Sequence, residues 1–300
     1  MTPGAGRRKG MALVLVAGMF WGATGTLQAL APSGAHPLTV GAIRVVLAGL
    51  ILTAYSSWRH KGLSFLRKAL PFPLAVGVAG IMGFQFSFFS ALKLTGVAMG
   101  TMIAIGASPM MAGLLGAILE KEPLSGRWLL STATAVLGCS LLVSGSSWGS
   151  MAIHWGGICL AFLAAFCYSL MGLGLKRLGA AMDSLDATTL VTGASIFVGL
   201  PVLLALDSSW IPTLRGITVA VALGAATMAL PICLFTIGLQ RIYLRDAFTL
   251  SLMEPFTACI LSAVVLGERL SPVSLAGAVL IFLGILLLPQ SPGNKNGEAE

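Results

Sequence analysis

Apolar runs of about twenty residues recur along the whole chain, and this pattern constrains the fold more than any other feature. A helix needs about 20 mostly apolar residues to cross the hydrocarbon core of a membrane, because each residue adds about 1.5 Å. The runs are continuous rather than alternating, which favours helices over the strands of a barrel. We therefore predict an all-α polytopic membrane protein with ten transmembrane helices, over residues 11–30, 38–57, 71–91, 96–118, 128–146, 155–175, 187–206, 215–238, 246–266 and 273–289.

Composition excludes several other classes of protein. Only 9% of the 300 residues are charged and 57% are hydrophobic, whereas soluble domains carry about 25% charged residues. An ordinary soluble enzyme, a nucleic-acid-binding protein and a disordered protein are therefore excluded. The predicted connections are short, the longest covering about residues 58–70, so no separate domain outside the membrane is expected.

Basic residues set the expected orientation, since lysine and arginine stay on the cytoplasmic side. Residues 7–9 are basic, and most of the 18 lysines and arginines fall in the even-numbered loops or at the ends of the chain. The odd-numbered loops hold only Lys93, Arg215 and Arg269. We expect a multi-pass protein of the bacterial inner membrane with both termini cytoplasmic. The first run, followed by Ala29-Leu30-Ala31, also fits a secretory signal, but the repeat described next favours a permanent span.

The two halves of the chain repeat each other at a constant offset of 146 residues. We therefore predict two five-helix units, residues 1–146 and 147–300. Because five is odd, the second unit enters the membrane from the opposite side, and inverted repeats are typical of transporters. A duplication in a membrane enzyme or scaffold is the alternative. The matching pairs are Gly10/Gly156, Phe20/Phe166, Pro109/Pro255, Glu122/Glu268, Leu124/Leu270, Ser125/Ser271 and Gly138/Gly284.

Three short segments carry a resemblance to a known family. The first is Gly18–Gly22, and the others are the matched ends at residues 118–124 and 265–270, each followed by a last helix that contains glycine. With ten spans in two halves, they resemble the drug/metabolite transporter superfamily, EamA type. The stretch at 251–255 and the chain length are most similar to bacterial amino-acid exporters, in particular those of aromatic amino acids. The resemblance implies helices around a central cavity and outward transport of amino acids or similar metabolites.

Two ionisable residues lie deep inside predicted spans, where charge is costly. Arg44 is either a ligand-binding residue or a side chain that extends to the headgroups. Glu254 is a candidate for binding a substrate ammonium or a coupling proton, and pairing with Arg44 or a polar neighbour is the structural alternative. Asp246 is expected at the cytoplasmic mouth of the same span, in contact with solvent.

Matched prolines mark a second candidate feature. Pro109 and Pro255 occupy equivalent places in spans 4 and 9, where each removes a backbone hydrogen bond. Interruptions at corresponding positions of two halves indicate a transporter's binding site, so we predict hinges there; a bend needed only for packing is the alternative. Pro201 and Pro231 have no matched partner and are interpreted as packing features.

Polar and aromatic side chains inside the spans are the candidates for lining a cavity. Trp21 and Gln28 share a face of span 1, and other candidates lie on spans 3, 4 and 6. Hydrogen bonds between helices are the alternative role for the polar ones. The predicted substrate-binding set is Trp21, Thr24, Gln28, Gln85, Phe89, Ser108, Tyr168 and Glu254.

Motifs for other chemistry are absent from the sequence. The five cysteines all lie in predicted spans without a CxxC, and no HExxH or P-loop occurs. We expect no metal, no cofactor and no enzymatic activity. In the related small multidrug-resistance proteins a glutamate in the first helix binds protons and cationic drugs, and span 1 here has no acid.

Together these features predict an inner-membrane exporter of aromatic and other neutral amino acids that works by alternating access. The same fold with another small metabolite or a drug as cargo is the alternative, and a channel or membrane enzyme is a more distant one. The expected partners are a small-molecule substrate and membrane lipid, with no nucleic acid. A monomer is one interpretation of the oligomeric state, which the sequence does not fix.

Overall fold

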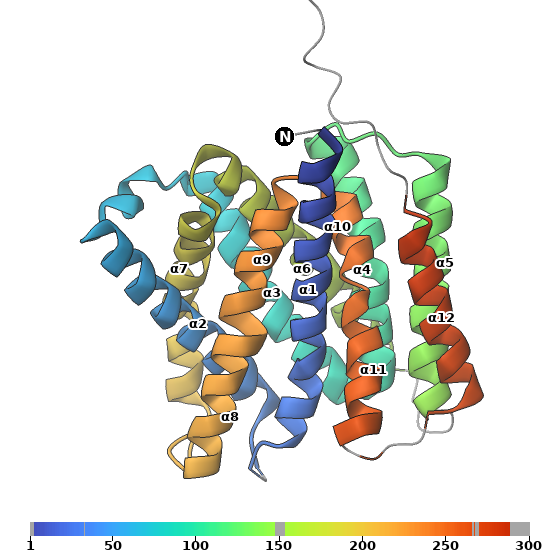
Figure 1. Cartoon of the computed structure of the whole chain (residues 1–300). Coiled ribbons are helices and arrows are strands. Elements are labelled where there is room, and N and C mark those ends of the chain that lie inside the picture. Colours follow the sequence, from blue (N-terminus) through green and yellow to red (C-terminus); the bar gives the residue numbers. More distant parts are fainter. Residues whose placement is uncertain (1–2, 33, 148–153, 266, 268–269, 289–300) are drawn as a thin grey trace, which may run out of the picture.

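Ten helical spans, connected by short loops, make up the described part of the chain. The structure, a computed structural model, describes residues 3–32, 34–147, 154–265, 267 and 270–288, and no strand occurs among them. The first five spans are α1 (Pro3–Ala29), α2 (Pro37–His60), α3 (Pro71–Thr95), α4 (Val97–Leu119) and α5 (Gly126–Ser147), with a short 3₁₀ helix, η1 (Ser64–Lys68), after α2 (Figure 1).

The second half contains two spans that are not single α-helices. The elements are α6 (Trp155–Ala181), α7 (Ser184–Ala205), α8 (Leu214–Gly224), η2 (Ala225–Ala229), α9 (Leu230–Leu239), α10 (Leu244–Leu250), α11 (Met253–Val265) and α12 (Pro272–Leu286). Span 8 is α8 and α9 joined through the π-helical turn η2, and span 9 is α10 and α11 with a break at Ser251 and Leu252.

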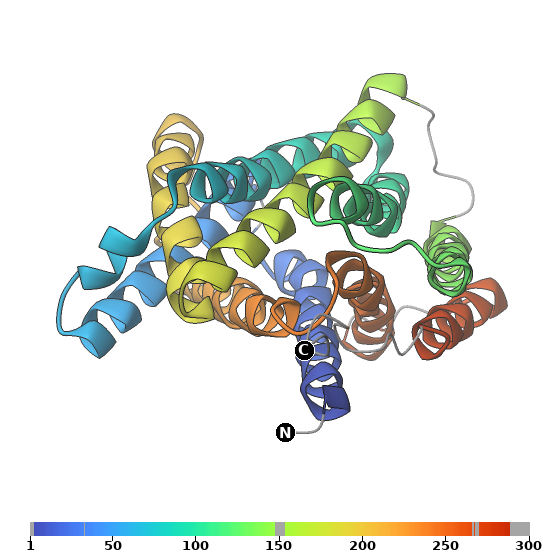
Figure 2. The same ribbon diagram turned by 90° about the horizontal axis from the view of Figure 1, so that it is seen from above.

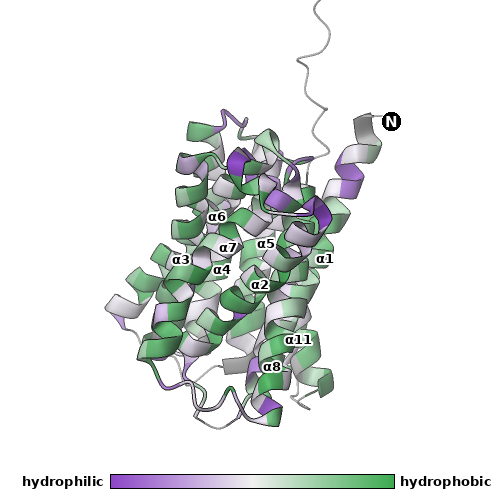
Figure 3. Ribbon diagram, turned by 90° about the vertical axis from the view of Figure 1, so that its left-hand side faces the viewer, coloured by the Kyte–Doolittle hydropathy of each residue, from purple (hydrophilic) through white to green (hydrophobic). Residues whose placement is uncertain are grey.

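The membrane-spanning character of the fold is confirmed. Nine helices within the described residues are long and apolar enough to cross a membrane, and the shorter apolar helix α12 occupies the tenth predicted span. Figure 3 shows apolar residues over the middle of the bundle and hydrophilic residues gathered toward its two ends. Lys176 and Arg177, predicted in a loop, lie instead on the last turns of α6.

Helix pairing is symmetric when the two halves are exchanged. The α3–α6 pair corresponds to α1 packed on α9, and α4–α6 corresponds to α1–α11. The pairs α2–α7 and α5–α12 each join equivalent spans, and α5 and α12 stand side by side at one edge of the bundle (Figures 1 and 2). The predicted boundary between the units adjoins residues 148–153, which lie outside the described residues, as does Glu268 of the repeat.

The contact between α5 and α12 depends on glycines. A Cβ on Gly138 would lie 2.5 Å from the backbone nitrogen of Ile281, and one on Gly284 would lie 2.6 Å from that of Ala135. These two contacts are equivalent under the 146-residue offset. Lipid tails are as apolar as the helices, so close backbone approach holds spans together in a membrane. Ser131 adds a hydrogen bond across the pair, donating to the Gly284 carbonyl at 2.6 Å.

We predict that Gly138→Leu destabilises the protein, because the new side chain would push α12 away from α5. Overpacking of this kind costs about 1–3 kcal/mol. The thermal unfolding midpoint in detergent should therefore fall by several degrees. Gly126→Leu on the same helix is the control, since a Cβ there meets nothing within 4 Å. Equal midpoints for the two variants would contradict this account of the α5–α12 contact.

Candidate binding cavity

A cavity of about 220 Å³ lies between the two halves, and both contribute to its wall. Its lining residues come from α1, α2, α3, α4, α6, η2 and α11. They lie from the middle of the bundle toward the end opposite the N-terminus, because Gln28 is near the end of α1 and Thr101 near the start of α4. Gly25 faces this space, and a Cβ there would meet nothing within 4 Å.

Most of the predicted site residues meet at this cavity. The members that line it are Trp21, Thr24, Gln28, Gln85, Phe89, Tyr168 and Glu254. Pro255, predicted as a hinge, also lines it. Phe84, Phe88 and Met171, which the sequence analysis did not select, are among the other apolar residues of the wall. Nothing in their sequence context distinguishes them from the other apolar residues of their spans.

Ser108 and Pro109 are not among the residues that line the cavity. Pro109 cannot donate the backbone hydrogen bond that the Ile105 carbonyl would receive in a regular helix. The Ser108 hydroxyl donates to that carbonyl at 2.8 Å instead, so α4 continues through Pro109 without a break. The Ser108 carbonyl accepts a hydrogen bond from Ser169 of α6 at 3.1 Å. Ser108 therefore has a structural role, which was the alternative for polar groups in the spans.

Pro255, the counterpart of Pro109, lies beside an actual break in its span. The carbonyl that it leaves free, that of Ser251, accepts the Glu254 backbone N–H at 2.8 Å. Glu254 consequently stands in the first turn of α11, where the positive end of the helix dipole favours a negative charge. The break thus places a carboxylate at the cavity.

Arg44 lies inside the bundle and does not extend to the headgroups. The side chain is buried at 6% exposure and lines the cavity. Its guanidinium donates to the Thr227 carbonyl of η2 at 3.1 Å and to the Thr24 hydroxyl at 3.4 Å. Thr227 lies in the π-helical turn η2, and Pro231, four residues further on, has no N–H to donate to the Thr227 carbonyl. Pro231, interpreted from the sequence as a packing feature, therefore leaves the acceptor that holds Arg44.

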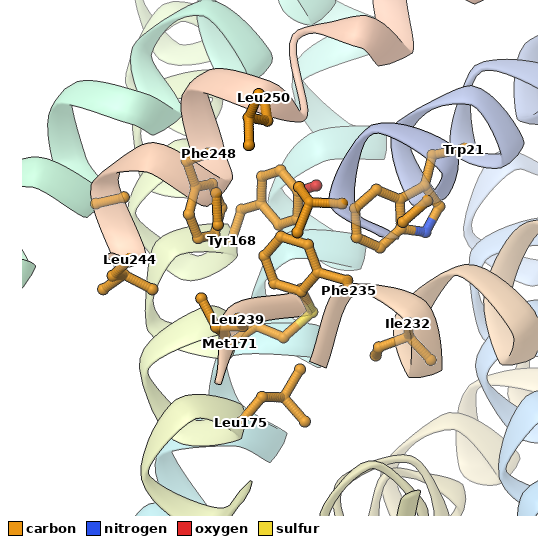
Figure 4. Packing of buried hydrophobic residues seen from close by; sticks show 14 of the residues in the cluster. Trp21, Tyr168, Met171, Leu175, Ile232, Phe235, Leu239, Leu244, Phe248 and Leu250 are labelled. Atoms are coloured by element: carbon orange, nitrogen blue, oxygen red, sulfur yellow. The ribbon is translucent and has the colours of Figure 1, made fainter. Parts of the chain in front are cut away.

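Four aromatic rings close the cavity on the side that faces the N-terminal end of the bundle. The Trp21 and Tyr168 ring centroids are 5.9 Å apart, those of Tyr168 and Phe248 are 4.7 Å apart, and Phe235 lies 5.6 Å from Phe248. Figure 4 shows these rings packed together from α1, α6, α9 and α10, with Met171, Leu175 and Leu239 beside them. The cavity therefore ends in a layer of packed aromatic side chains in the direction of the N-terminus.

Beyond the aromatic layer, the N-terminal end of the bundle is held by ion pairs. Lys176 pairs with Glu122, whose carboxylate also accepts the Leu244 backbone N–H at 2.8 Å. Asp246 pairs with Arg7 at 3.2 Å and with Arg245 at 3.4 Å. The prediction that Asp246 meets solvent is wrong, because its side chain is fully buried. Every ion pair found in the described residues lies at this end.

One exposed carboxylate at the same end both caps a helix and forms an ion pair. Asp183 caps the N-terminus of α7 by accepting the Leu185 N–H at 3.0 Å, and it pairs with Arg59 at 3.0 Å. The hydrogen bond from Arg59 lowers the pKa of Asp183 below its ordinary value.

No group of three or more metal-ligating side chains occurs in the described part of the chain.

The fold and the cavity together define a polytopic membrane transport protein. Comparison with known families agrees, because the model described as the EamA-like transporter family matches the chain twice, over residues 8–144 and 155–289. The chain belongs to this family. The two matches correspond to the two halves seen in the helix pairing.

Several relatives are similar over most of their length. An uncharacterized transporter of Bacillus subtilis, YwfM, is 37% identical over 95% of this chain and 96% of its own. The threonine/homoserine exporter RhtA of Escherichia coli is 29% identical over 80% of this chain and 78% of its own. A probable amino-acid metabolite efflux pump of Salmonella typhimurium is 28% identical over 74% and 78%. A crystal structure at 21% identity superposes with a TM-score of 0.80 over 93% of this chain and 95% of that one, which shows the fold.

The position of the cavity predicts opposite accessibility for two glycines of α1. In a background without native cysteines, Gly25→Cys and Gly6→Cys should react with a membrane-impermeant maleimide from opposite sides of the membrane. Both positions leave open space for the new side chain, and only Gly25 lines the cavity. Labelling of both from one side would contradict a cavity that opens away from the N-terminal end.

Proposed function

We propose that this transporter exports aromatic and other neutral amino acids across the bacterial inner membrane by alternating access. One observation carries the proposal. The cavity between the halves combines an aromatic wall with the amides of Gln28 and Gln85 and the carboxylate of Glu254. Aromatic and apolar walls suit an uncharged side chain, and the few polar groups suit the charged ends of an amino acid.

The relatives support amino acids as the class of substrate. RhtA exports threonine and homoserine, and the Salmonella protein is a probable efflux pump for amino-acid metabolites. The preference for aromatic side chains rests on the wall formed by Trp21, Phe84, Phe88 and Tyr168. The cavity volume of about 220 Å³ is below the range of about 300–1,000 Å³ typical of drug-binding pockets, which favours a small metabolite over a drug.

Orientation follows from the basic residues in this proposal. The N-terminal end carries most of the lysines and arginines, so it faces the cytoplasm with both termini. The cavity then opens to the outside, and the aromatic layer with its ion pairs is the closed inner gate. Both halves of a single chain contribute to the cavity wall, so we propose the monomer as the unit of transport.

The change between an outward-open and an inward-open state would follow from the symmetry of the two halves. Residues 1–146 and 147–300 form the two units, and inverted repeats can adopt each other's arrangement, which closes one side as the other opens. In the structure α4 passes through Pro109 unbroken whereas span 9 is broken before Pro255. We propose that these two positions act as the hinges. In the inward-open state span 4 would then be broken at Pro109, and span 9 would be continuous through Pro255.

Transport in liposomes that contain only this protein tests the proposal. We expect saturable flux of phenylalanine, leucine and threonine, with lysine excluded because the cavity wall offers its charged end no further acid. Trp21→Ala should lower phenylalanine flux at least roughly tenfold, since the ring forms part of both wall and gate. Trp155→Ala is the control, because that side chain is 75% exposed and away from the cavity. No flux of any amino acid would remove the assignment of substrate.

Glu254→Gln separates two roles of the carboxylate. If Glu254 binds the substrate ammonium, the variant should lose flux at every pH gradient. If it carries a coupling proton, exchange of labelled for unlabelled phenylalanine should persist while the response to a pH gradient disappears. Unchanged flux in both Trp21→Ala and Glu254→Gln would show that the substrate binds elsewhere.

A further inference from the structure

Three residues that line one cavity each carry a buried polar atom without a hydrogen-bond partner. Within the described residues only five buried side-chain nitrogen or oxygen atoms lack a partner, and Arg44 Nε, Gln85 Oε1 and the Tyr168 hydroxyl are three of them. All three residues line the cavity and are at least nine-tenths buried. Buried polar groups are nearly always satisfied, so this concentration marks the cavity as a place where a polar ligand would find partners.

The other two atoms have a different setting. Trp128 Nε1 and Arg245 Nη1 belong to side chains stacked on each other, with the guanidinium carbon 5.6 Å from the Trp128 ring. Arg245 also has a counter-ion, since it pairs with Asp246 at 3.4 Å. Neither residue lines the cavity. The unpartnered atoms of Arg44, Gln85 and Tyr168 therefore form a group of their own at the cavity.

Arg44 is a buried cation that contacts only uncharged oxygens. Its hydrogen bonds go to the Thr227 carbonyl and the Thr24 hydroxyl, and it forms no ion pair within 4.0 Å with any acid of the described chain. Charged groups in the interior of a membrane protein pair with one another or line a substrate pathway. Arg44 lines the cavity rather than pairing with an acid, and its free Nε and forked guanidinium suit a carboxylate.

Glu254 supplies the opposite charge in the same cavity without touching Arg44. Each is held separately, Arg44 by the carbonyl that Pro231 leaves free and Glu254 by the first turn of α11. Two opposite charges kept apart at one cavity match a ligand that carries both charges. An amino acid has its carboxylate and ammonium on one carbon atom.

We infer that Arg44 binds the α-carboxylate of the transported amino acid, with Glu254 and Gln85 Oε1 receiving its ammonium. This inference rests on the proposed function and names how the substrate is recognised. Pro231 is a positioning residue, since it acts through the Thr227 carbonyl. The side chain of the substrate then lies against the aromatic wall.

Binding of three ligands to the unmodified protein tests the inference without any substitution. Phenylalaninamide keeps the ammonium and lacks the carboxylate, whereas 3-phenylpropionate keeps the carboxylate and lacks the ammonium. We expect both to bind the purified protein at least tenfold more weakly than phenylalanine, measured by calorimetry or by radioligand displacement.

Substitution of Arg44 assigns the effect to its guanidinium. Arg44→Gln should weaken phenylalanine binding at least tenfold and leave phenylalaninamide binding unchanged, and Arg44→Lys should restore part of the loss. Arg215→Gln is the matched control, because Arg215 also bonds a backbone carbonyl, that of Leu30 at 2.7 Å, but does not line the cavity. If Arg44→Gln does not fold, the ligand comparison on the unmodified protein decides.

The outcomes separate this inference from the proposed function. Equal binding of phenylalanine and phenylalaninamide would overturn the role of Arg44 and leave an amino-acid transporter standing. Binding of 3-phenylpropionate that depends on Arg44, without binding of phenylalanine, would retain the carboxylate site and remove the amino-acid assignment. Absence of binding by all three ligands would overturn both.

Discussion

Backbone hydrogen bonding is the constraint on which this structure depends. Inside a bilayer every N–H and C=O must find a partner within the protein, so a proline in the interior of a span leaves a carbonyl that another group has to satisfy. Ser108 does this for Pro109, the Glu254 N–H does it for Pro255, and Arg44 does it for Pro231. The first solution preserves a helix, whereas the other two place charged residues at the cavity. The same chemical defect therefore produces both structural support and a binding site.

The two ends of the bundle differ although the two halves correspond. One end is closed by the rings of Trp21, Tyr168, Phe235 and Phe248 and by ion pairs beyond them, whereas the cavity lies toward the other end of the bundle. Matched prolines also differ, because α4 is unbroken and span 9 is broken. A transporter built from inverted repeats shows this asymmetry when it is open to one side.

The sequence predicted the spans well, because the length and continuity of an apolar run reflect the thickness of the membrane directly. It also selected seven of the cavity residues, since polar and aromatic side chains stand out in such runs. It did not predict where the Arg44 side chain points, because an arginine near the end of a span can extend either to the headgroups or into the bundle. The Thr227 carbonyl, which accepts its hydrogen bond inside the bundle, decides between the two. Ser108 does not line the cavity, and Asp246 is buried where contact with solvent was expected. Their partners Ile105, Arg7 and Arg245 follow from local geometry and tertiary packing that no periodicity encodes.

A structure of the protein with phenylalanine bound in a lipid environment tests the central claim most directly. The account predicts the ligand in the cavity between the halves, with its carboxylate on Arg44, its ammonium toward Glu254 and its ring against the aromatic wall. A ligand bound outside this cavity, or bound in it with the carboxylate directed away from Arg44, would contradict the account.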